Sequence, residues 1–230
     1  MPILQKAIDD KNATLYIEPF VGGANIIDKI KCSKKVGYDI HPQLIAMWKA
    51  LQEGWEPPDH ISEEEYNNVK SNKDDYPDYY VGYVGFNATF GAKYFGGYAR
   101  SFKDDGVTPR DQSNEAYRNI MKQLPSVRDV QFINDTYLSI NSNVSNAIIY
   151  CDPPYKSKTK YKTEEFDYEQ FWDWCRNMSK HNEVFISEYE APEDFTCIWE
   201  KESLANFDSK RGDTDKEKKK RVEKLFVLKK

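Results

Sequence analysis

The hydrophobic pattern of the first fifty residues alternates between strand-like and helix-like stretches. Short apolar runs predict strands at Thr14–Glu18 and Lys35–Tyr38. A helix is predicted over Ile26–Lys31 and another over Leu44–Leu51, the second with Pro42 in its first turn, where proline is tolerated. This order of strand, helix, strand and helix is typical of a parallel sheet.

The pattern breaks in residues 53–125, which are polar, rich in Tyr, Gly and Asn, and poor in apolar runs of strand length. Helices are predicted at Glu63–Val69 and Asp111–Leu124. Between them, Gly82–Arg100 fits neither the helical nor the strand period. We therefore predict that this part of the chain is an insert.

After the insert, the chain returns to apolar runs of strand length. Ala147–Cys151 is a continuous apolar run of the kind that is buried on both faces of a sheet. The remaining predicted elements are strands at Val130–Ile133, Glu183–Ser187 and Val222–Leu228, the last paired as a hairpin with Phe195–Glu200, and a helix at Tyr168–Ser179. We predict a doubly wound α/β domain with helices on both faces of its sheet, formed by residues 1–52 and 126–230 and interrupted by the insert at 53–125.

The composition is that of a globular protein, with 39 % hydrophobic and 14 % aromatic residues among 230. The formal net charge is −5. An acidic total neither favours nor excludes a nucleic-acid partner, because affinity depends on where the basic groups cluster.

Membrane, secretory and metal-binding signals are not found in the sequence. No apolar run approaches the roughly 20 residues that span a bilayer, and the start does not read as a signal peptide, so we expect a cytoplasmic protein without a membrane partner. The four cysteines form no C-x-x-C pair, which argues against a zinc ribbon or a disulfide framework. The three histidines show no paired metal-ligand spacing, and no metal site is predicted.

The strongest chemical signal is Asp152-Pro153-Pro154-Tyr155, directly after the strand Ala147–Cys151. Ligand sites of open α/β sheets lie beyond the carboxyl ends of the strands. The prolines keep the backbone extended and present carbonyl oxygens without competing N–H donors. A carboxylate and a carbonyl can accept both hydrogens of a planar amino group, while Tyr155 stacks on its ring, and this would free the nitrogen lone pair for attack. A plain turn is the alternative, since Asp and Pro favour turns.

A second signal lies between the first strand and the first helix, in Glu18-Pro19-Phe20-Val21-Gly22-Gly23-Ala24-Asn25. Glycines allow a tight turn and a close approach of the backbone to a ligand, although an ordinary strand–helix turn would also explain them. Asp39 ends the next strand, where an acidic side chain can accept hydrogen bonds from ribose hydroxyls; the alternative is a helix N-cap. Together the two features favour a cofactor that carries a nucleoside.

These segments resemble those of the Dam-type DNA adenine-N6 methyltransferases, in which a cofactor loop, a target-recognition insert and a catalytic motif follow in this order. Glu18–Asn25 is similar to the cofactor loop, Asp152–Tyr155 to the catalytic motif, and Asn134–Tyr137 to the turn beside the cofactor adenine. Further segments that resemble the family are Tyr38–Ile40, Gly82–Arg100, Phe166–Tyr168, Ser187–Tyr189 and Glu223–Phe226.

The resemblance implies a Rossmann-like methyltransferase sheet, S-adenosylmethionine as cofactor, and methyl transfer to adenine N6 of a base flipped out of double-stranded DNA. The cofactor-binding residues that it implies are Glu18, Pro19, Phe20, Gly22, Gly23, Asn25, Asp39, Ile40, Asp135 and Thr136. The implied catalytic residues are Asp152, Pro153, Pro154 and Tyr155.

Two groups of residues are candidates for DNA contacts. Lysines alternate with a tyrosine just after the catalytic motif, a pattern that suits phosphate contacts and stacking on a displaced base: Lys156, Lys158, Lys160 and Tyr161. In the insert, Asn87, Lys93 and Arg100 lie among glycines and aromatics, and Asn and Arg are the residues that read adenine and guanine in the major groove. Solvated surface loops are the alternative for both groups.

The sequence leaves other functions open. The chain starts at Met1-Pro2-Ile3-Leu4, without the Gly-x-Lys-type segment that family members carry before the first strand. A non-catalytic DNA-binding relative is therefore one alternative, and a cytosine-N4 or RNA amino-methyltransferase is another. The oligomeric state is not predicted, and a phage or a restriction–modification system would both be settings for such an enzyme.

Overall fold

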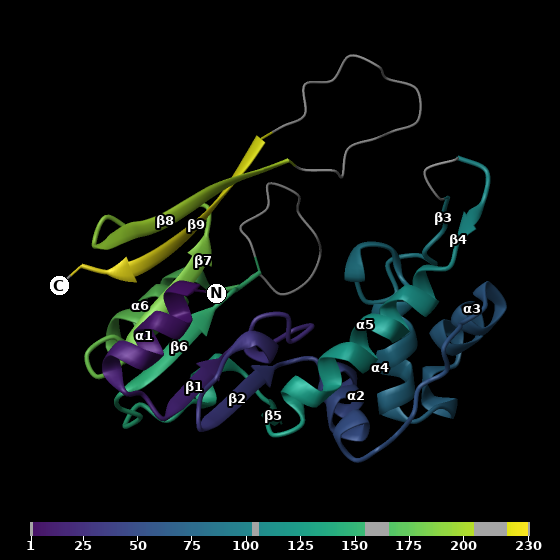
Figure 1. Cartoon of the computed structure of the whole chain (residues 1–230), viewed down its shortest axis with the longest axis horizontal. Coiled ribbons are helices and arrows are strands. Elements are labelled where there is room, and N and C mark those ends of the chain that lie inside the picture. The colour runs from purple at the N-terminus through teal and green to yellow at the C-terminus, as the bar shows by residue number, and fades with distance from the viewer. Residues whose placement is uncertain (1, 103–105, 155–165, 205–219, 230) are drawn as a thin grey trace. The chain divides into compact units, whose positions relative to one another are not determined.

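The computed structural model describes residues 2–102, 106–154, 166–204 and 220–229 (Figure 1). Its α-helices are α1 (Pro2–Lys11), α2 (Pro42–Gln52), α3 (Glu63–Ser71), α4 (Asp78–Asn87), α5 (Gln112–Val127) and α6 (Tyr168–Met178). Its strands are β1 (Leu15–Glu18), β2 (Lys34–Asp39), β3 (Ser101–Phe102), β4 (Pro109–Arg110), β5 (Gln131–Asn134), β6 (Ala147–Cys151), β7 (Glu183–Glu188), β8 (Phe195–Leu204) and β9 (Lys220–Leu228). Short 3-10 turns are η1 (Ile27–Lys29), η2 (Lys73–Asp75), η3 (Phe90–Ala92) and η4 (Tyr137–Ser139).

The chain divides into two compact units. The first unit is Val21–Tyr137, and the second is Pro2–Phe20 with Leu138–Lys230. The insert predicted at 53–125 lies wholly within the first unit, and its role in DNA recognition stays a prediction.

One seven-stranded sheet has the strand order β5-β2-β1-β6-β7-β9-β8, which confirms the predicted α/β sheet. The order runs outward in both directions from β1 and β6, and such a switch point is where ligands bind in doubly wound folds. Within the second unit, β1, β6 and β7 are parallel, with Ile17 opposite Ile149 and Cys151 opposite Ile186. The strands β8 and β9 form the predicted antiparallel hairpin, and β9 pairs with β7.

Both faces of the central strands in the second unit are covered. Three consecutive residues of β6, Ala147–Ile149, are buried, as are Val184–Ile186 of β7. Because neighbouring side chains on a strand point to opposite faces, such runs require packing on both sides. Helix α1 packs against β6 and α6 against β7. Helix α1 was not among the predicted elements; it buries Leu4 and Ile8, one turn apart, on its sheet-facing side.

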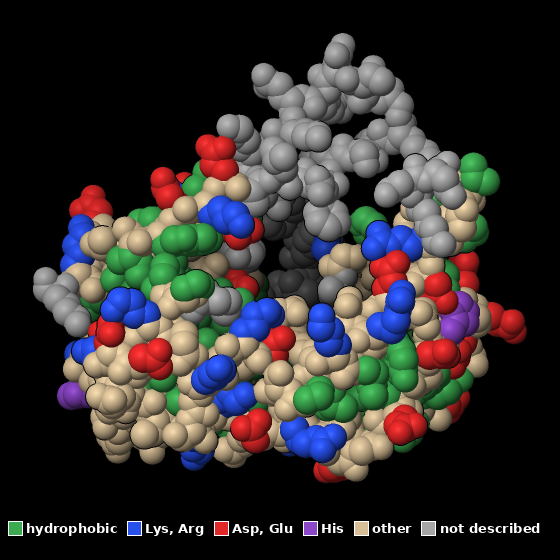
Figure 2. Space-filling view, in the orientation of Figure 1, with side chains coloured by type: hydrophobic (Ala, Val, Ile, Leu, Met, Phe, Trp, Pro, Cys, Tyr) green, Lys and Arg blue, Asp and Glu red, His purple; other side chains and the backbone are tan. Residues whose placement is uncertain are grey.

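The edge strand of the hairpin, β8, is protected by charge. Glu200, Lys201 and Glu202 are exposed along it, and charged edge residues discourage pairing with another chain. Ile198 and Trp199 of the same strand are also partly exposed, and Figure 2 shows apolar side chains gathered over the hairpin.

In the first unit, β2 and β5 pair in parallel and α2 packs on both. The α2 ring of Trp48 stacks on Phe132 of β5 at 5.5 Å between ring centroids. Helix α4 packs so closely along α2 that a Cβ on Gly82 would lie 2.1 Å from the Gln43 carbonyl oxygen. Val81–Gly85 is buried throughout. A helix buried on several sides has no amphipathic period, which explains why the sequence pattern predicted no element in Gly82–Arg100.

The helix predicted over Ile26–Lys31 is wrong. Only the 3-10 turn η1 forms there, and the backbone is extended again at Ile30. Three isoleucines fall in this segment, and β-branched residues are restricted in helices. Ile27 and Ile30 are buried, so core packing, rather than helix propensity, determines the path of this segment.

None of the helices in the described ranges is long and apolar enough to cross a bilayer.

The N-cap of α5 gives a test of the fold. Asp111 accepts hydrogen bonds from Asn114 N at 2.9 Å and Ser113 Oγ at 2.8 Å. Partial burial opposes ionisation, but these bonds and the neighbouring His60 hold the pKa of Asp111 below its ordinary value. We expect Asp111→Ala to lower the free energy of unfolding by about 1 kcal/mol at neutral pH, as loss of an N-cap does.

Because the folded-state pKa of Asp111 is lowered, the stabilisation is present at neutral pH and is lost as the pH falls through that pKa. Urea unfolding of wild type and Asp111→Ala should therefore differ at neutral pH and converge in acid. Replacing the exposed Asp74 by Ala is the control. Equal unfolding midpoints for wild type and Asp111→Ala at neutral pH would contradict the capping role.

Candidate functional site

In the first unit, Asp39 at the carboxyl end of β2 organises the predicted cofactor residues. Its carboxylate accepts hydrogen bonds from Gly22 N at 3.1 Å and from His41 N at 2.9 Å. Its carbonyl accepts bonds from Asn134 Nδ2 at 2.9 Å and Asp135 N at 3.2 Å. The structure therefore brings three segments together around Asp39. They are the ends of β2 and β5 and the loop Val21–Asn25, called the glycine loop.

The charge state of Asp39 follows from its surroundings. Burial raises the pKa of its carboxyl above the ordinary value, while the two backbone N–H groups oppose that rise. Burial lowers the pKa of the adjacent His41, which favours the neutral imidazole, while the charge of Asp39 opposes this shift. Each carboxylate oxygen of Asp39 has accepted one of these bonds, and an ionised carboxylate has about four lone-pair positions, so it can still accept ligand hydroxyls.

The glycine loop beside Asp39 is open where a ligand would approach. Gly22 has φ +47°, and a Cβ placed on it would meet nothing within 4 Å. Gly23 is exposed, as is Asn25, whereas Ala24 between them is buried. The loop is anchored to β2 by the bond from Val21 N to the Tyr38 carbonyl, at 2.8 Å.

Ile40 and Asp135 lie at the same edge of the first unit. The Ile40 side chain is 74 % exposed, an apolar surface beside a polar cluster. Asp135 is exposed, and its Oδ1 accepts a bond from Thr136 N at 2.8 Å. A carboxylate for ribose hydroxyls, an apolar surface for a ring and a second carboxylate for an amino group form a set that fits the nucleoside of S-adenosylmethionine.

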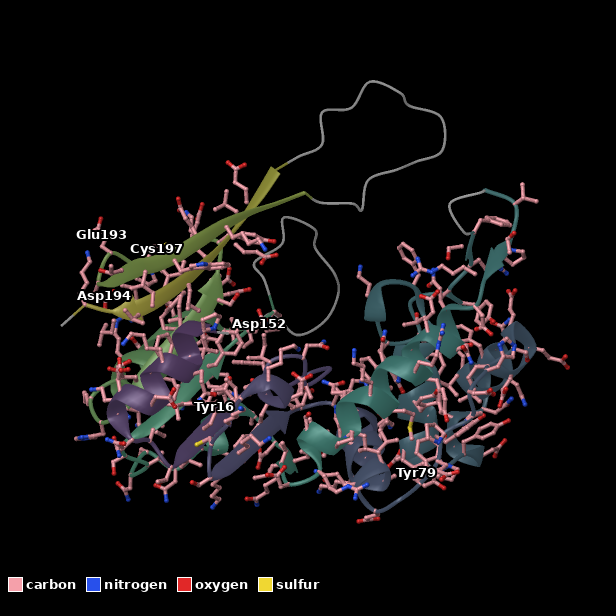
Figure 3. The ribbon with its side chains drawn as sticks, in the orientation of Figure 1. Tyr16, Tyr79, Asp152, Glu193, Asp194 and Cys197 are labelled. Carbon is pink, nitrogen blue, oxygen red and sulfur yellow. The ribbon has the colours of Figure 1, made fainter. Side chains whose placement is uncertain are left out.

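In the second unit, the predicted catalytic motif follows the buried end of β6. Asp152 is exposed, between buried Cys151 and buried Pro153 (Figure 3). The Pro154 carbonyl accepts a hydrogen bond from the hydroxyl of Tyr168, at the start of α6. Tyr155 lies outside the described residues, so the stacking role predicted for it stays a prediction.

Four aromatic rings form a cluster near the start of α6, the helix that contacts this motif. The ring of Phe166 lies 5.8 Å from Phe20 and 4.9 Å from Tyr168, and Phe20 lies 5.8 Å from Phe171. Phe20 follows β1, Tyr168 and Phe171 lie in the first turns of α6, and Phe166 precedes that helix. The cluster therefore connects the segment after β1 with the helix that holds the Pro154 carbonyl.

Acidic side chains lie at the carboxyl ends of three neighbouring strands of the second unit. Glu18 ends β1 and is 2 % exposed, and it accepts a hydrogen bond from Tyr16 Oη at 2.7 Å. Glu188 ends β7 and is 4 % exposed, with Oε2 bonded to Tyr189 N at 2.8 Å. Asp152 follows β6 between them. Because parallel strands end at one edge, the three carboxyl side chains lie at the same edge of this unit.

Tyr168 and Glu188 were not predicted as site residues. Burial, reinforced by the negative charge of Glu188, raises the pKa of Tyr168 to about 12. The hydroxyl is therefore a donor throughout the ordinary pH range. Both residues lie in the two short segments, Phe166–Tyr168 and Ser187–Tyr189, whose resemblance to a family was the available signal.

The candidate DNA contacts differ in what surrounds them. The Asn87 amide donates to the Tyr83 carbonyl at 3.1 Å, within α4. Arg100 is exposed and forms a two-point ion pair with Glu63, at the start of α3. Lys93 is exposed. Lys156, Lys158, Lys160 and Tyr161 lie outside the described residues.

No group of three or more His, Cys, Asp or Glu side chains in the described part of the chain is arranged to hold a metal ion.

Comparison with known proteins identifies the family. The model of the "D12 class N6 adenine-specific DNA methyltransferase" family matches residues 1–89 and 82–212. No match to a curated protein was found.

Two solved structures are similar at low identity. A Streptococcus mutans protein assigned as a methyltransferase and crystallised with SAH is 9 % identical, with a TM-score of 0.37, over 99 % of this chain and 98 % of that one. An rRNA methylase from Streptococcus thermophilus is 8 % identical, with a TM-score of 0.35, over 100 % of this chain and 96 % of that one. The family match extends over most of the sequence, so the chain belongs to the D12 class N6 adenine-specific DNA methyltransferases, which transfer the methyl group of S-adenosylmethionine to adenine N6 of DNA.

Proposed function

We propose that the residues after β6 orient the amino group of the target adenine, and that the glycine loop and the ends of β2 and β5 bind the cofactor. The observation that carries the first assignment is the exposed carboxylate of Asp152, fixed between buried Cys151 and buried Pro153. The second rests on Asp39, which is bonded to Gly22 N and keeps acceptor positions for hydroxyls.

The chain supplies acceptors rather than a strong base. Asp152 accepts one hydrogen of the adenine amine, and the Pro153 carbonyl accepts the other. Tyr168 already donates to the Pro154 carbonyl, which favours the Pro153 carbonyl as the second acceptor. When bound, the cofactor supplies a methyl group that its sulfonium has already activated. Orientation of the amine is therefore the main contribution of these residues.

For the cofactor, Asp39 accepts the ribose hydroxyls, Asp135 and Thr136 contact the adenine edge, and Ile40 packs on its ring. Glu18, Pro19, Phe20, Gly22, Gly23 and Asn25 form the loop that faces the methionine part. These roles are supported by the hydrogen bonds around Asp39 and by the exposure of Ile40.

The substrate that we propose is double-stranded DNA in the cytoplasm, from which the target base is flipped, because an amine inside a duplex cannot reach Asp152. The proposed DNA contacts are Asn87, Lys93, Arg100, Lys156, Lys158, Lys160 and Tyr161, with residues 53–125 as the recognition region. Methyl transfer to a duplex and to each of its separated strands, followed by digestion to nucleosides, tests this assignment. Equal rates on duplex and single strands would contradict it.

Asp152→Ala tests the catalytic assignment. We expect S-adenosylmethionine to bind with nearly unchanged affinity, because Asp152 is assigned to the amine, while methyl transfer falls at least about a hundredfold. Calorimetric titration and single-turnover transfer of labelled methyl measure the two effects. Asp173→Ala, which removes another exposed aspartate, is the control. Single-turnover transfer at the wild-type rate in Asp152→Ala would defeat the assignment.

Asp39→Ala tests the cofactor assignment. Loss of hydrogen bonds to a charged acceptor should raise the Kd for S-adenosylmethionine about ten- to a hundredfold. Because burial raises the pKa of Asp39, the wild-type Kd should begin to rise at a higher pH than for an ordinary aspartate as the solution is acidified. Asp39→Asn should remove this pH dependence. An unchanged Kd in both variants would exclude Asp39 from the cofactor site.

Tyr168→Phe tests the support of the catalytic motif. Loss of the bond to the Pro154 carbonyl should lower kcat about threefold to tenfold and leave the Kd for S-adenosylmethionine unchanged. Tyr76→Phe removes a hydroxyl that accepts a bond from Asn68, and as a control it should leave kcat unchanged. A wild-type kcat in Tyr168→Phe would show that this hydrogen bond does not support the motif.

A further inference from the structure

Three consecutive carbonyl groups of the glycine loop accept hydrogen bonds from side chains. The Gly22 carbonyl accepts a bond from Trp48 Nε1 at 3.0 Å. The Gly23 and Ala24 carbonyls accept bonds from Gln123 Nε2, at 3.1 and 2.7 Å. The loop is therefore held from outside its own sequence, by α2 and by α5.

The backbone of this loop needs such support. Gly22 has φ +47° and Ala24 has φ +53°. The left-handed region is unstrained for glycine but strained for alanine, because the alanine Cβ lies too close to the following carbonyl oxygen. Ala24 keeps this conformation while its N–H bonds to the Val21 carbonyl at 2.8 Å and its carbonyl accepts from Gln123. A residue that is strained in this way persists only where its surroundings determine it.

The same contacts orient the N–H groups of the loop. In a trans peptide, the carbonyl and the following N–H point in opposite directions. The Gly22 carbonyl faces Trp48 and the Ala24 carbonyl faces Gln123, so Gly23 N–H and Asn25 N–H point away from these side chains. Backbone N–H groups presented by a turn can bind a carboxylate, such as that of a methionine moiety.

Gln123 comes from a distant part of the chain. It lies a hundred residues after Gly23, on α5, and near the end of the region 53–125 that is proposed to recognise DNA. Helix α5 also packs on η1, the turn that follows the loop. The shape of the loop thus depends on a helix outside the β1–β2 segment.

We propose that Gln123 is a positioning residue for the cofactor: its amide holds the loop carbonyls so that the loop N–H groups face the methionine part of S-adenosylmethionine. This inference rests on the proposed cofactor role of the loop. It makes cofactor affinity depend on α5, through the bonds from Gln123 to the loop carbonyls.

Gln123→Glu and Gln123→Leu test the inference, because both keep the approximate size of the side chain and remove its N–H donors. Gln52 provides a matched control. Its amide also donates to backbone carbonyls, those of Val127 at 2.7 Å and Val130 at 2.8 Å, which lie outside the loop. Gln52→Glu and Gln52→Leu therefore remove the same kind of amide donor elsewhere in the first unit.

Loss of two hydrogen bonds should raise both the Kd and the KM for S-adenosylmethionine about tenfold in the Gln123 variants. Their kcat at saturating cofactor and their Kd for duplex DNA should stay within about twofold of wild type, because neither the catalytic motif nor the DNA contacts change. The Gln52 variants should lower the thermal midpoint and leave the Kd for S-adenosylmethionine within about twofold of wild type.

Two results would overturn the inference. One is a wild-type Kd for S-adenosylmethionine in both Gln123 variants while Asp39→Ala binds the cofactor more weakly. The proposed cofactor site would then stand, but Gln123 would not be a positioning residue for it. The other is an equal rise of the Kd in the Gln52 variants, which would make the effect one of general stability. If Asp39→Ala also binds the cofactor with wild-type affinity, the proposed site itself is wrong.

Discussion

Parallel strand pairing is the constraint on which the candidate site residues of each unit depend. In the second unit it places Glu18, Asp152 and Glu188 after three neighbouring strands at one edge. In the first unit it sets Asp39 of β2 opposite Asn134 of β5, so that Asp135 follows beside it. No single segment of the sequence contains either group, and the register of the strands brings the members of each together.

The candidate carboxylates of the two units lie in different environments. Asp39 is half-buried and bonded to two backbone N–H groups, which fix its orientation while burial raises the pKa of its carboxyl. Asp152 is exposed, with a buried residue on either side of it. An orienting acceptor for a base that arrives from outside must be accessible, whereas a ribose ligand gains from an acceptor that is already positioned.

The sequence pattern was sufficient to predict the buried strands and the acidic residues that directly follow them. A short apolar run and a following acidic residue are both visible in the sequence. The pattern therefore predicted the positions of Asp39 and Asp152 at strand ends, together with the terminal hairpin and the strands β1, β2, β5, β6 and β7. Tyr168 was missed, since its bond to the Pro154 carbonyl joins residues fourteen positions apart. Such a contact depends on how α6 packs, and no periodicity shows it.

Helix α4 and the glycine loop differ from the sequence pattern for one physical reason, which is that tertiary contacts outweigh local preference in both. Gly82 and Gly85 have low helix propensity, yet α4 forms because the missing Cβ atoms let it approach α2 and the rings of Tyr94 and Phe95. In the glycine loop, Ala24 adopts φ +53° against its local preference, while Trp48 and Gln123 hold the loop carbonyls. A strained local conformation at a strand end is costly for folding, and it is retained where a ligand needs its N–H groups. The departure from local propensity therefore supports the cofactor role that we propose for this loop, and this support is independent of any motif.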